Sequence, residues 1–195
     1  TYGDWSSNVC SSDLADGGTR RPEALIMPGT VAIGLGNPLM GDDGIGLAML
    51  AAIMERWRCE GVTLVDGGTW GLSLLPEIED ADRLLLMDAI SAGAAPGEGV
   101  RLPRSGLPIY LAKRLSPHQV DLRDALALAE WRGTTPSEVV AMGIRPESVE
   151  LSTSLSKPVA EAMTLLEGAV VARLRDWGHL CRRHVIQDQR HGSQR

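Results

Sequence analysis

Short apolar runs alternate along the chain with longer stretches of helical period. The short runs are rich in Val, Ile and Leu, as in strands that are covered on both faces of a sheet, and occupy residues 30–36, 62–68, 83–90 and 137–144. A further run at residues 97–104 contains Pro103 and is expected to be an edge strand. The longer stretches repeat apolar residues at helical spacing; they cover residues 44–57, 71–80, 120–131 and a segment that starts near Pro158.

This alternation predicts an α/β fold of the phosphorylase/hydrolase-like kind, with a single doubly wound, mostly parallel five-stranded sheet and helices on both faces. We expect residues 29–177 to form the one domain. Residues 1–28 are polar without a period, and we interpret them as a disordered leader that does not look native to the domain. Residues 178–195 are rich in Arg and His, which predicts a flexible basic tail with solvated histidines.

Composition narrows the possible partners. With 25 acidic and 19 basic residues, the net charge of -6 argues against nucleic acid binding, which favours basic surfaces. No apolar run reaches the roughly 18 residues of a membrane span, and no signal-peptide pattern is visible. We therefore expect neither a nucleic acid nor a membrane as partner.

The cysteines bear on the compartment. Cys10, Cys59 and Cys181 lie far apart and lack the spacing of a metal site. An odd and scattered set is typical of a reducing compartment, so a cytoplasmic location is expected. All three lie outside the motifs described below, which gives a thiol nucleophile little support.

The candidate chemistry begins in the glycine-rich segment GLGNPLMGDDGIG, residues 34–46. A dinucleotide-binding loop would need a glycine where Leu39 stands, and no Gly-Lys-Ser/Thr ending of a Walker loop follows. Asp42 and Asp43 would repel a phosphate at the start of the following helix, but they suit a cation or the helix dipole. We expect Asp42 to cap the helix, which leaves Asp43 for another role.

Asp88 and His118 complete a candidate set of metal ligands. Asp88 ends an apolar strand, where a carboxylate is costly to bury without a use, although a capping role remains an alternative. If strands 30–36 and 83–90 are neighbours, Asp43 and Asp88 meet at the carboxyl edge of the sheet. His118 precedes a helix whose dipole favours the neutral ring; a lone histidine is otherwise more often structural. Two carboxylates and an imidazole suit a borderline divalent metal with open positions.

The chain resembles the hydrogenase maturation proteases, which trim the C-terminal extension from the large subunits of nickel-iron hydrogenases. The blocks that carry the resemblance follow in family order: GLGNPLMGDDGIG, VDGGTWGLSLL, LLLMDAI, SPHQVDL, GIRPESVELSTSLS and VAEAM. The resemblance implies that Asp43, Asp88 and His118 contact the metal, with Asp43 standing where many members have Glu. Asp66, in VDGGT, is a further catalytic-site candidate that would orient the substrate tail, or is simply a turn residue.

The activity implied by the resemblance is that of an endopeptidase that cuts the large-subunit precursor once, after nickel insertion. The nickel would arrive with the substrate and be recognised by Asp43, Asp88 and His118, with no organic cofactor. The metal could polarise the scissile carbonyl, activate water or only dock the substrate, and the sequence leaves these roles open. A monomer is expected.

Two alternatives use the same opening motif. Peptidyl-tRNA hydrolase-like enzymes also have a strand followed by GLGNP, but they place a catalytic histidine soon afterwards, and none stands there in this chain. A non-enzymatic binding module on a flavodoxin-like scaffold is the other alternative. The missing third glycine and the aspartate pair count against it.

Overall fold

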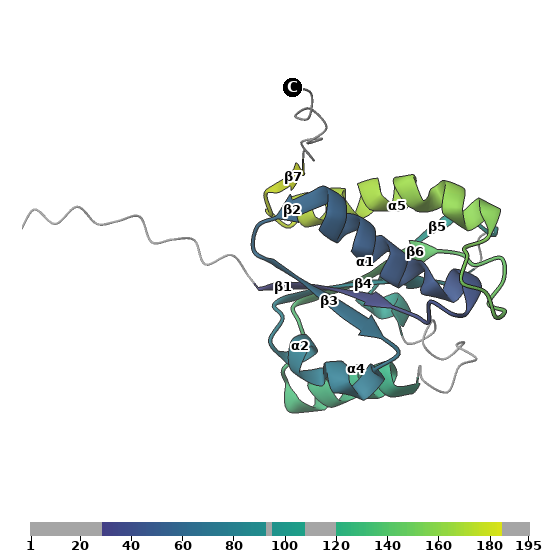
Figure 1. Ribbon diagram of the computed structural model, residues 1–195. Helices are drawn as coiled ribbons and strands as arrows, with labels where there is room; N and C mark the ends of the chain where they lie inside the picture. The colour runs from purple at the N-terminus through teal and green to yellow at the C-terminus, as the bar shows by residue number, and fades with distance from the viewer. Residues whose placement is uncertain (1–28, 93–94, 108–119, 185–195) are drawn as a thin grey trace, which may run out of the picture.

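The computed structural model describes residues 29–92, 95–107 and 120–184 (Figure 1). Its main sheet has five strands in the order β3-β1-β4-β6-β5. These strands are β1 (Thr30–Leu35), β3 (Val62–Gly68), β4 (Arg83–Ala89), β5 (Gly99–Pro103) and β6 (Glu138–Ile144). All pairings are parallel except that between β5 and β6. The predicted mostly parallel sheet is confirmed, and the run containing Pro103 is an edge strand.

Helices cover both faces of this sheet (Figure 1). One face carries α1 (Ile45–Arg56) and α5 (Lys157–Asp176), and the other carries α2 (Leu75–Glu79) and α4 (Val120–Arg132). Short 3-10 turns precede or connect these elements: η1 (Gly41–Gly44), η2 (Gly71–Leu74) and η3 (Arg104–Gly106). No helix within the described ranges combines the length and apolar composition that a membrane span requires.

Each face of the sheet has its own hydrophobic core. Met87 of β4 packs with residues of α1 and α5, whereas its neighbour Leu86 packs with residues of α2 and α4. Successive side chains of a strand point to opposite faces. A strand covered on both sides must therefore be apolar at nearly every position, which explains the continuous run Leu84–Met87.

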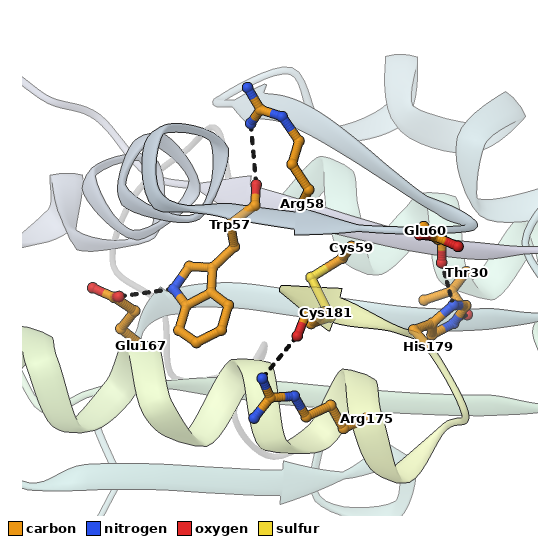
Figure 2. The surroundings of a disulfide bond; sticks show 9 residues. All are labelled: Thr30, Trp57, Arg58, Cys59, Glu60, Glu167, Arg175, His179 and Cys181. Atoms are coloured by element: carbon orange, nitrogen blue, oxygen red, sulfur yellow. Dashed lines mark hydrogen bonds between the residues drawn. A yellow bond between two sulfur atoms is a disulfide. The ribbon is translucent and has the colours of Figure 1, made fainter. Parts of the chain in front are cut away.

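A second, two-stranded sheet corrects the prediction of a flexible tail. The strands β2 (Trp57–Cys59) and β7 (Cys181–Arg183) pair antiparallel, with Cys59 opposite Cys181. The two cysteines form a disulfide, shown in Figure 2. Residues 178–184 are thus part of the folded domain. Strands of three residues are too short for a period to be visible in the sequence.

Two arginines near this small sheet, Arg56 and Arg175, have hydrogen-bond partners, and those of Arg175 are drawn in Figure 2. The buried Glu167 accepts hydrogen bonds from the indole of Trp57 at 2.8 Å and from the guanidinium of Arg56 at 2.6 Å. Arg175 donates to the carbonyl of Cys181 at 2.7 Å, and its guanidinium lies 5.3 Å from the centre of the Trp57 ring. These contacts join β2 and β7 to α5.

His179 is buried, contrary to the expectation of a solvated histidine. Its Nδ1 lies 2.9 Å from the carbonyl oxygen of Glu60, and its Nε2 lies 2.7 Å from Oγ1 of Thr30 (Figure 2). Because a carbonyl only accepts hydrogen bonds, Nδ1 carries a proton; in the neutral ring, Nε2 then accepts the hydroxyl proton of Thr30. The ring therefore fastens the segment before β7 to the start of β1.

The disulfide removes the argument from the cysteines for a reducing compartment. Cys181 was placed in a terminal segment by the sequence analysis, but it is 3% exposed and bonded to Cys59. Cys10 lies outside the described residues. The cytoplasmic location stays a prediction that no longer draws support from scattered thiols.

Replacing Cys59 and Cys181 together with Ser should lower the free energy of unfolding by about 2–4 kcal/mol, because the bond closes a long loop. Urea unfolding with and without a reductant measures this effect. The reductant should lower the unfolding midpoint of the wild-type protein and leave that of the double variant unchanged. An unfolding midpoint of the wild-type protein that does not respond to the reductant would contradict the assignment.

Candidate functional site

The candidate site lies at the carboxyl edge of the main sheet. β1 and β4 are parallel neighbours, with Thr30 opposite Arg83 and Gly34 opposite Met87. The turn η1 follows β1, contains Asp42 and Asp43, and packs against β4. Asp88 is the residue after Met87 on that strand. The sequence analysis expected Asp43 and Asp88 to approach each other if their two strands were neighbours, and the strands are neighbours.

Glycines at the start of α1 make this arrangement possible. A Cβ atom at Gly46 would overlap the carbonyl oxygens of Leu35 and Met87, so only glycine lets α1 lie this close to β1 and β4. Gly36 has a φ of +115°, and a Cβ atom there would overlap the carbonyl oxygen of Asp43. In a dinucleotide-binding loop, the third glycine allows the helix and the strand to approach closely. In this chain Leu39 stands at that position, and Gly46 allows the close approach instead.

Asp88 is fully buried at the end of β4. Its Oδ1 accepts a hydrogen bond from the backbone N–H of Ala89 at 2.7 Å. By the alternation of the strand, its side chain is on the face where Leu84 and Leu86 pack with α2 and α4. His118 stands two residues before α4 in the sequence but lies outside the described residues.

Asp43 is held in a compact turn and is partly buried. Its Oδ2 accepts a hydrogen bond from the backbone N–H of Asn37 at 2.8 Å. Its own backbone N–H donates to the carbonyl of Met40 at 3.1 Å. The carboxylate is therefore oriented by the segment that leaves β1.

Asp42 does not cap α1, as the sequence analysis expected. The N-cap of α1 is Gly44, with no side-chain capping bond, and Asp42 is 1% exposed. Its Oδ1 accepts from the N–H of Ser156 at 2.7 Å, and its Oδ2 accepts from Ser156 Oγ at 2.8 Å and from the N–H groups of Glu147 and Ser148 at 2.9 and 3.0 Å. Burial raises the pKa of Asp42, but these hydrogen bonds outweigh it and hold the pKa below its ordinary value.

Asp66 is exposed on β3, opposite Gly34 of β1. Because β3 is parallel to β1, Asp66 stands towards the same carboxyl edge as the turn of Asp43. It lies on the outer strand of the sheet, beyond β1 as seen from Asp88. Its proposed role toward a substrate tail remains a prediction.

Comparison with known proteins identifies the family. The model of the hydrogenase maturation protease family matches residues 48–173, which include Asp88 and His118 and begin just after Asp43. The hydrogenase expression/formation protein HoxM of Azotobacter vinelandii is 37% identical over 161 residues, covering 76% of this chain and 78% of the relative. The chain belongs to the hydrogenase maturation protease family.

Further similarities agree on the class of enzyme. The hydrogenase 2 maturation protease of Escherichia coli K12 is 35% identical over 153 residues, covering 76% of this chain and 92% of the relative. The structure of the hydrogenase maturating endopeptidase HybD from E. coli matches with a TM-score of 0.76 and 30% identity, over 80% of this chain and 97% of that one. This family member is therefore a hydrolase of the endopeptidase type, and both alternatives considered above are set aside.

The metal-ligand set of this maturation protease is only partly within the described residues. Among residues 29–92, 95–107 and 120–184, no three His, Cys, Asp or Glu side chains are placed to hold a metal ion. Asp43 and Asp88 would supply two of the three predicted ligands, and His118, the third, lies outside these ranges. The donor chemistry suits a borderline divalent metal, but the complete triad remains a prediction.

An apolar groove of about 480 Å³ lies elsewhere on the maturation protease. It runs between α5 and the strands β5 and β6, and its lining includes Val100, Met142 and Leu165. Asp43, Asp66 and Asp88 are not among its lining residues. The groove does reach Gly143, which pairs with Asp88 in the sheet.

Sequence reasoning missed the loop that holds Asp42. This loop, residues 145–156, joins β6 to α5 and belongs to the block GIRPESVELSTSLS. Its run of serines before Pro158 was a usable signal, since serine next to a helix start commonly makes local hydrogen bonds. Its partner could not be found, because Asp42 is 105 to 114 positions away in the sequence.

Replacing Gly46 with Ala should lower the free energy of unfolding by about 1–3 kcal/mol, because the added methyl forces α1 away from β1 and β4. Gly168→Ala is a matched control: Gly168 is an exposed glycine of α5, and its added Cβ would meet nothing within 4 Å. That control should gain up to about 1 kcal/mol from helix propensity. Urea unfolding compares the two, and equal effects would contradict the packing argument.

Proposed function

We propose that this maturation protease removes the C-terminal extension of a nickel-iron hydrogenase large-subunit precursor after nickel insertion. In this proposal Asp43, Asp88 and His118 recognise the nickel that the precursor carries. The observation that carries it is the pairing of β1 with β4, which brings the turn of Asp43 and the buried Asp88 to one edge of the sheet. Family membership supports the endopeptidase class of the reaction.

The chemistry of these side chains fits a metal that belongs to the substrate. Carboxylate and imidazole groups are suitable ligands for borderline divalent ions such as nickel. Three protein ligands would leave positions for the precursor's own ligands. Asp43, oriented through Asn37, and Asp88, fixed in β4, would then set where the precursor's chain crosses the edge of the sheet.

Water is the proposed nucleophile. Cys59 and Cys181 are bonded to each other in the β2–β7 sheet. The segment before β7 is held at the amino end of β1, where His179 contacts Thr30, whereas Asp43 follows the carboxyl end of that strand. Neither sulfur is therefore available near Asp43 or Asp88. A metal near a scissile carbonyl polarises it or makes a bound water more acidic, and either effect would assist hydrolysis.

Exposed apolar side chains around this edge suit a protein substrate. Leu39 is 55% exposed and Leu151 is 84% exposed, and their loops are joined by a hydrogen bond from the N–H of Ser152 to the carbonyl of Leu39. Trp70, just after β3, is 69% exposed. Exposed apolar surface beside a site is one mark of a protein–protein contact. We propose that they contact the precursor, with Asp66 orienting its tail.

Nickel dependence tests the proposal directly. Incubation of the protease with nickel-loaded precursor should release a short C-terminal peptide, and nickel-free precursor should stay intact. Mass spectrometry of both precursor forms measures the loss. Equal processing of the two forms would refute nickel recognition while leaving the endopeptidase class intact.

Variants of the predicted ligands test their separate roles. His118→Ala should abolish cleavage, and Asp88→Asn should do nearly as much, because an amide oxygen is a poorer ligand than a carboxylate. Asp43→Glu keeps the carboxylate and should be tolerated, whereas Asp43→Asn should not. Calorimetric titration with nickel or cadmium beside the cleavage assay checks these expectations. Unchanged cleavage by Asp43→Asn would count against a ligand role for this carboxylate.

A further inference from the structure

We infer that Asp42 is a positioning residue, which fastens the loop between β6 and α5 to the turn that carries Asp43 and so sets the geometry of the candidate site. This inference rests on the proposed function, because it acts through Asp43. Asp42 itself touches neither substrate nor metal in this scheme. Its role is to hold its neighbour in place.

The backbones of the two loops are joined along their length. The N–H of Gly41 donates to the carbonyl of Ser152 at 2.8 Å, and the N–H of Ser152 donates to the carbonyl of Leu39 at 3.0 Å. The N–H of Asp42 donates to the carbonyl of Ser148 at 3.1 Å. Met40 and Ser152 form an isolated parallel β-bridge. The loop after β6 therefore runs along the turn η1 and is hydrogen-bonded to it.

The carboxylate of Asp42 is the buried centre of this junction. It accepts hydrogen bonds from three backbone N–H groups, those of Glu147, Ser148 and Ser156, and from the hydroxyl of Ser156. Removing the carboxylate would deprive these part-buried donors of their acceptor at the buried Asp42, which weakens the hold of the turn on the loop. Ser156 is also the N-cap residue of α5, so the same carboxylate fixes where that helix begins relative to η1.

Asp43 is enclosed between this junction and the segment that leaves β1. On one side, Gly36 lies against its carbonyl, and Asn37 donates to its carboxylate. On the other side, the adjacent residue Asp42 is anchored to the loop at 147–156. A shift of this loop is transmitted to Asp43 through a single peptide bond. Displacement of a reacting group by about 1 Å can lower a rate by about 100-fold.

A role in stability alone would produce a different result, and Asp82 offers a matched control. Asp82 also accepts a backbone hydrogen bond, from the N–H of Gly29 at 2.7 Å, but it stands before β4, at the opposite edge of the sheet. Asp82→Asn therefore weakens a carboxylate–backbone contact far from Asp43. Ser156→Ala is a milder variant at the junction, since it removes only the hydroxyl from Asp42.

The experiment combines hydrogen exchange with cleavage of the nickel-loaded precursor, at a temperature where each variant is folded by circular dichroism. Asp42→Asn should speed amide exchange in peptides that cover residues 40–44 and 147–156, and should lower kcat/KM by about tenfold or more. Ser156→Ala should have a smaller effect of the same kind. Asp82→Asn should leave exchange in both peptides unchanged and kcat/KM within about twofold of the wild-type value.

The outcomes separate this inference from the proposed function. If folded Asp42→Asn cleaves as Asp82→Asn does, or if exchange at residues 40–44 is unchanged, the positioning role is wrong. If Asp42→Asn does not fold, Ser156→Ala decides by the same two measurements. If the wild-type protein leaves loaded precursor uncut, the proposed function fails, and exchange at residues 40–44 still shows whether Asp42 holds the turn of Asp43.

Discussion

The close contact of Gly46 with the backbones of β1 and β4 is the constraint on which the candidate site depends. Because position 46 has no side chain, the first turn of α1 rests directly on the carbonyl oxygens of Leu35 and Met87. The connection from β1 to α1 is then forced into a compact turn beside the end of β4. A larger residue would raise the helix and carry Asp43 away from the edge where Asp88 is buried.

The fold could be predicted because its strands are covered on both faces. Helices pack on each side of the segments Val31–Leu35 and Leu84–Met87, so these segments are continuously apolar. Such a pattern can be recognised in the sequence alone. The same reasoning located Asp88 at a strand end, and it expected Asp43 and Asp88 to meet only if β1 and β4 were neighbours, which they are. Local sequence patterns were thus sufficient to predict the architecture and the approximate place of the site.

The parts that could not be predicted depend on contacts between distant residues. The β2–β7 sheet has three residues in each strand, and its disulfide joins positions that are 122 residues apart. His179 is buried only because Glu60 and Thr30 meet it. No local pattern reports such partners. Likewise, the sequence analysis assigned Asp42 to a helix cap, and only the fold shows that Asp42 instead binds the loop between β6 and α5.

The surroundings of Asp42 and Asp43 assign the two adjacent carboxylates to different tasks. The carboxylate of Asp42 accepts four hydrogen bonds, three at Oδ2 from Glu147, Ser148 and the Ser156 hydroxyl and one at Oδ1 from the Ser156 N–H, so most of its acceptor capacity is used within the protein. To bind a cation through Oδ2, the buried Asp42 would have to give up hydrogen bonds from the loop, which is costly. Asp43 stands partly exposed in the same turn. A cation that reaches this edge therefore binds more readily to Asp43, while the hydrogen bonds of Asp42 join the turn to the loop between β6 and α5.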